Sequence, residues 1–182
     1  MPALTGPALA IAGLLALAGA QKVLDPTMTV GALRALHLPA SALAVRIGAA
    51  AELVLGVTAI GFGGPVTWSL VALSYLVFAA FVLAALRRGT MIGSCGCFGR
   101  EDTPPHWSHV ALNGALAGVA LAIAVQGHGA PLDAVLDDPA PGAAVALLAA
   151  VTLGLLYAAY VELPRAMTEA RRARELRRPS TS

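Results

Sequence analysis

Cys95 and Cys97 are the only two cysteines among the 182 residues, and one glycine separates them. Thiolates attack disulfides and bind soft metals, so thiols this close together predict either a redox pair or half of a metal site. A disulfide within Cys-x-Cys closes a small ring whose strain eases reduction, which suits exchange better than a permanent crosslink. Three nearby cations, Arg87, Arg88 and Arg100, would favour the thiolate form. We therefore predict that Cys95 and Cys97 are catalytic thiols.

A metal site is the alternative interpretation of the same segment. His106 and His109 follow the cysteines, and two thiolates with two imidazoles would satisfy tetrahedral zinc, while thiolates would suit copper(I). The spacing matches no common zinc module, in which Cys-x₂₋₄-Cys is the rule. We favour a pair of interfacial histidines beside Trp107 and keep metal binding or metal transport through Cys95, Cys97, His106 and His109 as the alternative.

Glu52 is an isolated carboxylate inside an apolar tract, since it is the only charge between Arg46 and Arg87. An intramembrane carboxylate needs a partner or a proton, which makes it a functional candidate. Lys22 and Arg46 are the expected partners, in a structural clamp or a proton relay. Asn113 is a weaker candidate, for a hydrogen bond between helices.

Long uncharged tracts must position these residues. Hydrophobic residues make up 58% of the chain and charged residues 12%, and the mean hydropathy is +0.76. A soluble domain carries about 25% charged residues, and a membrane-spanning helix needs about 20 mainly apolar ones. The tracts predict an all-α integral membrane protein with a four-helix transmembrane bundle plus a fifth transmembrane helix. The expected helices lie near Leu4–Ala20, Leu43–Ile60, Val66–Leu86, Val110–Val125 and Ala143–Tyr160.

The basic residues predict the orientation of these five helices. With alternating loops, all 12 Lys and Arg residues fall on one side of the membrane. The positive-inside rule then places the N-terminus outside and the C-terminus in the cytoplasm. A cleavable signal peptide is the alternative for the first tract, but residues 1–6 carry no basic side chain. Residues 162–182 form a basic tail that we expect to be solvated and cytoplasmic. No nucleic-acid-binding module or phosphate-binding loop is recognisable.

Several short motifs, met in order along the chain, resemble the methylamine utilisation MauE family, within the broader group of DoxX-like small membrane proteins. They are Gly19-Ala20-Gln21-Lys22 with Asp25-Pro26, Leu36-His37-Leu38-Pro39, Arg46 with Glu52-Leu53-Val54-Leu55-Gly56, Arg87-Arg88-Gly89, Ser94-Cys95-Gly96-Cys97-Phe98-Gly99, and Trp107 with Asn113. The Cys-Gly-Cys-Phe-Gly string is the most specific of them. The resemblance implies a MauE-like four-helix membrane domain over residues 1–126. An outer loop and fifth transmembrane helix follow over 127–161, and the basic tail over 162–182.

The resemblance also implies a function. Family members are thought to assist maturation of a disulfide-rich periplasmic subunit of methylamine dehydrogenase, alongside a thioredoxin-like partner. This implies thiol–disulfide exchange by Cys95 and Cys97 in a bacterial plasma membrane. The charge count, however, places both cysteines on the cytoplasmic side, where disulfides rarely persist. A quinone-like acceptor or a partner, a loop that folds back into the bundle, or a cytoplasmic exchange partner would each resolve this conflict. A non-catalytic membrane scaffold is the third alternative.

Overall fold

The computed structural model describes residues 4–88, 105–127 and 129–176, and all regular structure in these ranges is helical. The helices are α1 (Thr5–Leu24), α2 (Thr27–Ala35), α3 (Ala42–Gly61), α4 (Pro65–Arg87), α5 (Trp107–Gln126), α6 (Pro131–Leu136) and α7 (Pro139–Leu176). By length and composition, α1, α3, α4, α5 and the Pro139–Pro164 part of α7 are suited to cross a membrane. The five predicted spans and the all-α class are thereby confirmed.

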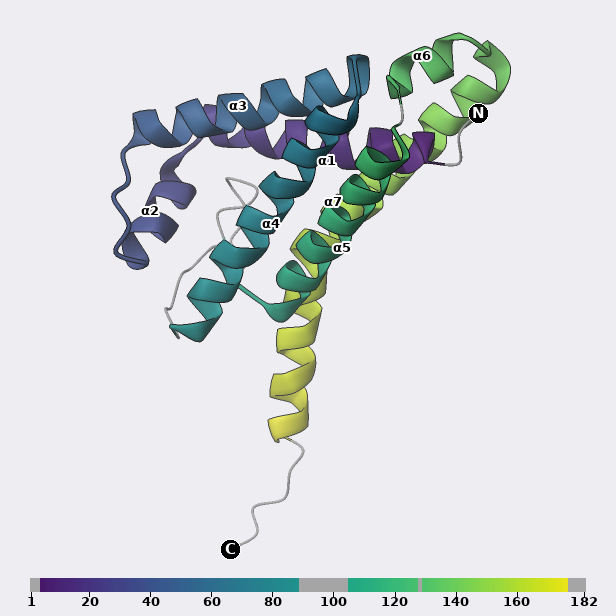
Figure 1. The fold of residues 1–182 in the computed structure, drawn as a ribbon. Helices are drawn as coiled ribbons and strands as arrows, with labels where there is room; N and C mark the ends of the chain where they lie inside the picture. Colours follow the sequence, from purple (N-terminus) through teal and green to yellow (C-terminus); the bar gives the residue numbers. More distant parts are fainter. Residues whose placement is uncertain (1–3, 89–104, 128, 177–182) are drawn as a thin grey trace, which may run out of the picture.

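Two helix pairs build the bundle. Figure 1 shows α1 and α3 side by side, crossing obliquely the pair formed by α4 and α5. The chain passes from α3 to α4 through Gly63 and Gly64, which take positive φ values of 63° and 90°, and Pro65 then starts α4. Because glycine adopts positive φ without a steric penalty, the chain can turn at these residues, between the helices expected near Leu43–Ile60 and Val66–Leu86.

Small residues let the backbones of α1 and α3 touch. A Cβ on Gly19 would lie 2.6 Å from the carbonyl oxygen of Ala49, and one on Gly56 would lie 2.6 Å from that of Ala12. Close backbone approach through small residues is a common way to associate helices in lipid, where burial of apolar surface gives little driving force. The two glycines therefore fix the separation of α1 and α3.

The core lies where α1, α4, α5 and α7 meet. The hydroxyl of Tyr75 on α4 donates a hydrogen bond to the carbonyl of Ile11 on α1, at 2.7 Å. Trp68 also lies in this core with no exposed surface. The sequence places Trp68 at a span end, where an interfacial position is expected. It is buried instead because it lies in the first turn of α4 and packs inward.

Three helical features go beyond the sequence prediction. The short helices α2 and α6 fall in segments predicted as loops, because they are too short for a periodic apolar pattern to stand out. The last helix, α7, runs 38 residues and continues past Pro164 to Leu176. Figure 1 shows its C-terminal part extending well beyond the bundle. The fifth span and much of the basic tail therefore form one helix.

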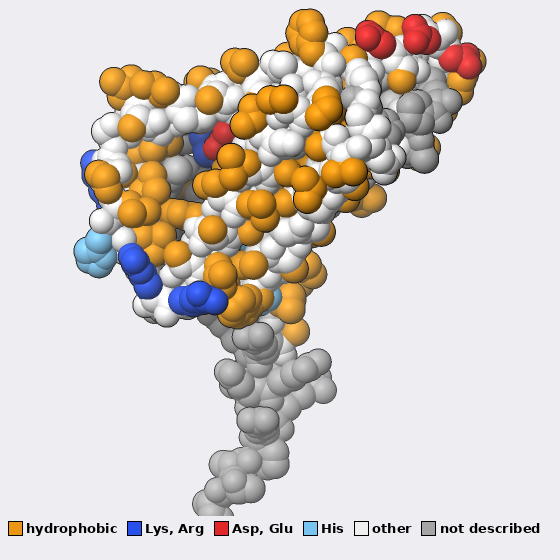
Figure 2. All heavy atoms as spheres, viewed as in Figure 1, with side chains coloured by type: hydrophobic (Ala, Val, Ile, Leu, Met, Phe, Trp, Pro, Cys, Tyr) orange, Lys and Arg blue, Asp and Glu red, His pale blue; other side chains and the backbone are white. Residues whose placement is uncertain are grey.

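The surface separates charge from apolar area. Figure 2 shows Lys and Arg side chains at one end of the bundle, acidic side chains at the opposite end over α6, and hydrophobic side chains between them. Asp133, Asp137 and Asp138 lie in or beside α6. Exposed apolar side chains such as Ile47, Val54 and Leu73 on the helix flanks are suited to lipid contact. This layout is the one that the topology prediction requires, and the orientation itself stays a prediction.

Candidate functional site

The two cysteines lie outside the described residues, because Cys95 and Cys97 fall within 89–104. The helices on either side of this segment are described: α4 ends at Arg87 and α5 begins at Trp107, and these two helices pack along each other. The described part of the candidate site therefore consists of the residues that hold the two ends of the segment between α4 and α5.

The end of α4 is tied to α2. Arg88 donates a hydrogen bond from Nη1 to the carbonyl oxygen of Leu36, at 2.6 Å. The Leu36 side chain is buried and packs with Ala32, Ala85 and Phe81. Because both an apolar cluster and a charge-assisted hydrogen bond join the two elements, the start of the segment is anchored to α2. Arg87 and Arg88 remain exposed there, so their positive charge is available to neighbouring groups.

The start of α5 is capped by its own histidines. Nδ1 of His106 accepts from the backbone N–H of Ser108 at 3.1 Å, and Nδ1 of His109 accepts from the backbone N–H of His106 at 3.2 Å. This is a capping box in which imidazoles replace the usual hydroxyl and carboxylate groups. The histidines thus satisfy backbone donors that a helix N-terminus leaves without partners.

His109 also locks α5 to α7. Its fully buried ring stacks on the ring of Tyr160, with 5.7 Å between centroids, and Nε2 lies 3.0 Å from the carbonyl oxygen of Tyr160. In a regular helix that carbonyl would accept from the N–H of residue 164, but residue 164 is proline and has none. The proline therefore removes the usual helical donor to this carbonyl, and His109 supplies a hydrogen bond to it from α5.

These contacts define the state of His109. Nδ1 accepts a hydrogen bond while Nε2 faces an acceptor, so the ring is neutral and carries its proton on Nε2. With both nitrogens engaged, His109 has no lone pair to offer a metal, which argues against its place in the alternative metal site. Among the described residues, no group of three or more His, Cys, Asp and Glu side chains could hold a metal ion.

Lys22 and Glu52 form an ion pair between α1 and α3. Their side chains are 5% and 20% exposed, and the Lys22 ammonium lies 4.5 Å from the centroid of the Phe78 ring. The predicted partnership of Glu52 with Lys22 is confirmed. Arg46 lies exposed on α3, and within the described part of the chain it makes no ion pair with Glu52. The reason is that Lys22 approaches from the neighbouring helix and meets the carboxylate directly.

The ion pair lies at the edge of a cavity of about 210 Å³, which we call the Lys22–Glu52 cavity. It is lined by Lys22, Thr29, Leu33, Val45, Gly48, Ala49, Glu52, Val77, Phe78 and Phe81. Figure 2 shows a hollow beside α3 that is flanked by hydrophobic side chains, with a basic and an acidic side chain together at its rim. The cavity opens on the apolar flank of the bundle.

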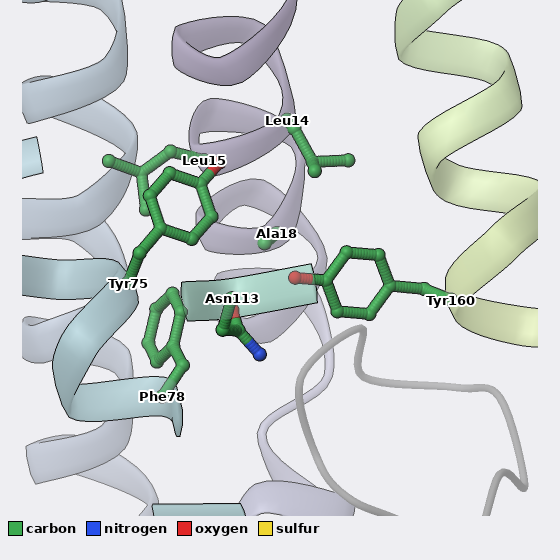
Figure 3. A pocket seen from close by; sticks show the side chains of 7 residues that line it. All are labelled: Leu14, Leu15, Ala18, Tyr75, Phe78, Asn113 and Tyr160. Atoms are coloured by element: carbon green, nitrogen blue, oxygen red, sulfur yellow. The ribbon is translucent and has the colours of Figure 1, made fainter. Parts of the chain in front are cut away.

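Asn113 lies one turn beyond His109 on α5 and is 1% exposed. Its amide nitrogen donates to the carbonyl of His109 at 2.8 Å, so this hydrogen bond stays within α5 instead of joining two helices as predicted. Figure 3 shows Asn113 beside a small cavity, with Tyr75 and Phe78 on one side and the hydroxyl of Tyr160 directed toward it from the other. Its volume of about 10 Å³ is at the lower limit of the space that can hold one water molecule.

The model of the family described as methylamine utilisation protein MauE matches residues 2–126. The chain belongs to the MauE family. Searches of curated proteins and of solved structures found no match. The MauE segment ends with α5, so α6 and α7 lie beyond it. Tyr160 therefore joins this chain's additional helix to the MauE segment through His109.

Sequence reasoning missed Tyr160 and Pro164 as part of this site. A proline within an apolar helix does carry a usable signal, because it frees the carbonyl four residues earlier and so requires a donor from elsewhere. The sequence cannot say which donor supplies it. That information comes from the packing of α5 against α7.

Proposed function

We propose that this MauE protein is a thiol–disulfide redox factor of the bacterial plasma membrane that assists the maturation of exported proteins. The observation that carries the proposal is the Cys95-Gly96-Cys97 motif within the segment that matches the family. The family description names methylamine utilisation, which makes a disulfide-rich methylamine dehydrogenase subunit the first client to examine.

The chemistry is reversible exchange with a thioredoxin-like partner. The thiolate of Cys95 or Cys97 attacks the partner's disulfide, forming a mixed disulfide and releasing one partner thiolate. The other cysteine then attacks the mixed disulfide, which forms the Cys95–Cys97 bond and releases the second partner thiolate. The reverse sequence passes the disulfide to the partner. The relative reduction potentials decide the direction.

Two features of the described residues support this role. Arg87 and Arg88, exposed at the end of α4, favour a thiolate in a nearby segment. The segment between α4 and α5 is also held firmly at both ends, by Arg88 on Leu36 and by the capping histidines. Anchored ends suit a redox loop, which must present its thiols to a partner repeatedly from the same place on the bundle.

Trapping of the mixed disulfide tests the proposal. A Cys95→Ser or Cys97→Ser variant cannot resolve the intermediate, so one of them should accumulate an adduct with a thioredoxin-like protein that dithiothreitol releases. The Cys95→Ser, Cys97→Ser double variant is the matched control and should show none. If neither single variant forms an adduct under oxidising conditions while both are inserted at normal levels, the redox role is wrong. A scaffold would keep its function in the double variant.

A further inference from the structure

The Lys22–Glu52 cavity combines features of a binding site for a small ring. Ion pairs in membrane helices are expensive and are normally enclosed by protein. Here the Glu52 side chain is 20% exposed and lines an open cavity with apolar walls. Glu52 lies at the middle of α3, ten residues after Ala42, or about 15 Å along the helix axis. Lys22 lies in the last turn of α1, so the polar pair joins the end of α1 to the middle of α3 and is reached through an apolar flank.

The position of the opening indicates how a ligand arrives. Gly48 and Val77 line the cavity and are exposed on the flanks of α3 and α4. The neighbouring residues Ile47 and Leu76 are more than half exposed, as lipid-facing residues are. A molecule entering between α3 and α4 would come from the hydrocarbon, which favours a lipid-soluble ligand over ions and water-soluble metabolites.

The charges in the cavity indicate the chemistry of the ligand. A carboxylic acid would meet Glu52 and an amine would meet Lys22, so neither sign of charge is favoured. A neutral oxygen fits both groups, because the ammonium donates a hydrogen bond to a carbonyl and the carboxylate accepts one from a hydroxyl. Phe78 and Phe81 add two aromatic walls suited to a planar ring. The volume of about 210 Å³ is below the roughly 300–1,000 Å³ of pockets for drug-sized ligands, so a single ring fits.

We propose that the Lys22–Glu52 cavity binds the ring of a membrane-dissolved quinone, with Lys22 donating a hydrogen bond to a ring carbonyl. Quinones combine these properties: they are soluble in lipid, they have a neutral planar ring, and their carbonyl oxygens become hydroxyls on reduction. The apolar tail of the quinone extends from the cavity between α3 and α4 into the bilayer. The site requires no contribution from the cysteines.

The redox role of this site rests on the proposed function. The dithiol of Cys95 and Cys97 loses two electrons and two protons and forms one S–S bond, while the quinone gains two electrons and two protons and becomes the hydroquinone. Glu52 is the carboxylate placed to pass a proton to a ring oxygen. Phe81 precedes Arg88 by seven residues, about 10 Å along α4, so the helix that lines the cavity also leads into the segment that carries the thiols.

Binding of a decyl-substituted benzoquinone to the full chain in lipid nanodiscs tests the site. Saturable binding of one molecule per chain is expected, after correction with empty nanodiscs. A Cβ on Gly48 meets no described atom within 4 Å, so Gly48→Leu fills the cavity without disturbing the backbone. We expect it to weaken binding about tenfold or more, equivalent to about 1.4 kcal/mol.

Gly118→Leu is the matched control. Gly118 also has open space at its Cβ position, but it lines a different groove, between α4 and α5. It should leave quinone affinity unchanged. Equal affinity in both variants, or no saturable binding in the unmodified chain, would overturn the proposal. Displacement of the quinone by an equal concentration of decylbenzene would also overturn the proposal. The cavity would then bind apolar molecules without recognising the carbonyl group.

The redox step is tested separately from the site. The Cys95→Ser, Cys97→Ser variant should bind the quinone as tightly as the unmodified chain but should not convert it to the hydroquinone. The conversion is measured by the change in ultraviolet absorbance of the quinone. The reduced unmodified chain should convert one molecule of quinone for each chain. Binding without conversion by the reduced chain would support the site and refute its role as electron acceptor.

Discussion

Replacing Pro164 by alanine returns an N–H to residue 164, which can then donate to the carbonyl of Tyr160. In the native chain Nε2 of His109 donates a hydrogen bond to this carbonyl, at 3.0 Å. The two residues thus supply alternative partners for one buried acceptor. We predict that the substitutions His109→Ala and Pro164→Ala are energetically coupled.

The magnitude of this coupling energy follows from the interactions that His109→Ala removes. It removes a fully buried ring, the cap on the His106 N–H and the donor to the Tyr160 carbonyl. Loss of a buried hydrogen bond costs about 1–3 kcal/mol, and the lost cap adds about 1 kcal/mol. In the Pro164→Ala background the helix satisfies the carbonyl, so only the cap and packing losses remain. The expected coupling energy is about 1–2 kcal/mol, within the range known for contacting residues.

A double-mutant cycle measures this coupling, with the free energy of unfolding obtained by steric trapping in bicelles. Pro141→Ala is the control, since Pro141 lies in the first turn of α7, where no helical N–H partner is lost. Additivity of His109→Ala with Pro164→Ala to within about 0.5 kcal/mol would refute the reasoning. An NMR signal for a proton on Nδ1 of His109 would refute it independently.

Three further predictions concern stability, each measured as the free energy of unfolding in mixed micelles. Gly56→Ala should cost about 1–3 kcal/mol because its Cβ would collide with the α1 backbone, whereas Gly118→Ala, in open space, should be neutral or stabilising by up to about 1 kcal/mol; equal effects would contradict the close packing of α1 and α3. Glu52→Leu should cost about 3–5 kcal/mol by stranding the buried ammonium of Lys22, and the added change Lys22→Met should restore most of the loss; failure of that rescue would mean that the pair is not the cause. His37 follows the C-cap of α2 with a φ of 60°, so His37→Gly should stabilise by about 1 kcal/mol, and destabilisation would show that the His37 side chain contributes more than its backbone strain costs.

The sequence predicts the spans well because lipid imposes a simple rule on them. A helix that crosses a bilayer must be long and apolar, and the charge-free tracts match the spans to within a few residues at most ends. The shorter helices α2 and α6 obey no such rule, since their few residues lie where both water and lipid are available. The sequence does not predict that one helix runs through Pro164, because the hydrogen bond from His109 to the carbonyl of Tyr160 depends on tertiary packing.

Pairing within the site was predictable only where chemistry leaves few choices. A carboxylate inside a span requires a partner, and Lys22 was one of two candidates for Glu52. The choice against Arg46 depends on the register of α1 against α3, which Gly19 and Gly56 determine through backbone contact. Asn113 had many potential acceptors, and its hydrogen bond to its own helix could not be read from residue types.

The continuity of α7 determines how the basic tail is presented. Residues 165–176 remain helical, so they extend about 18 Å from the end of the span at 1.5 Å per residue. A flexible linker of the same length would have an average reach of similar size, about 20 Å, but in every direction. A helical tail has one direction, set by the tilt of α7. A group near Leu176 is therefore held at a fixed distance and in a fixed direction from the bundle. At the end of a flexible linker it would instead sample many positions around the bundle.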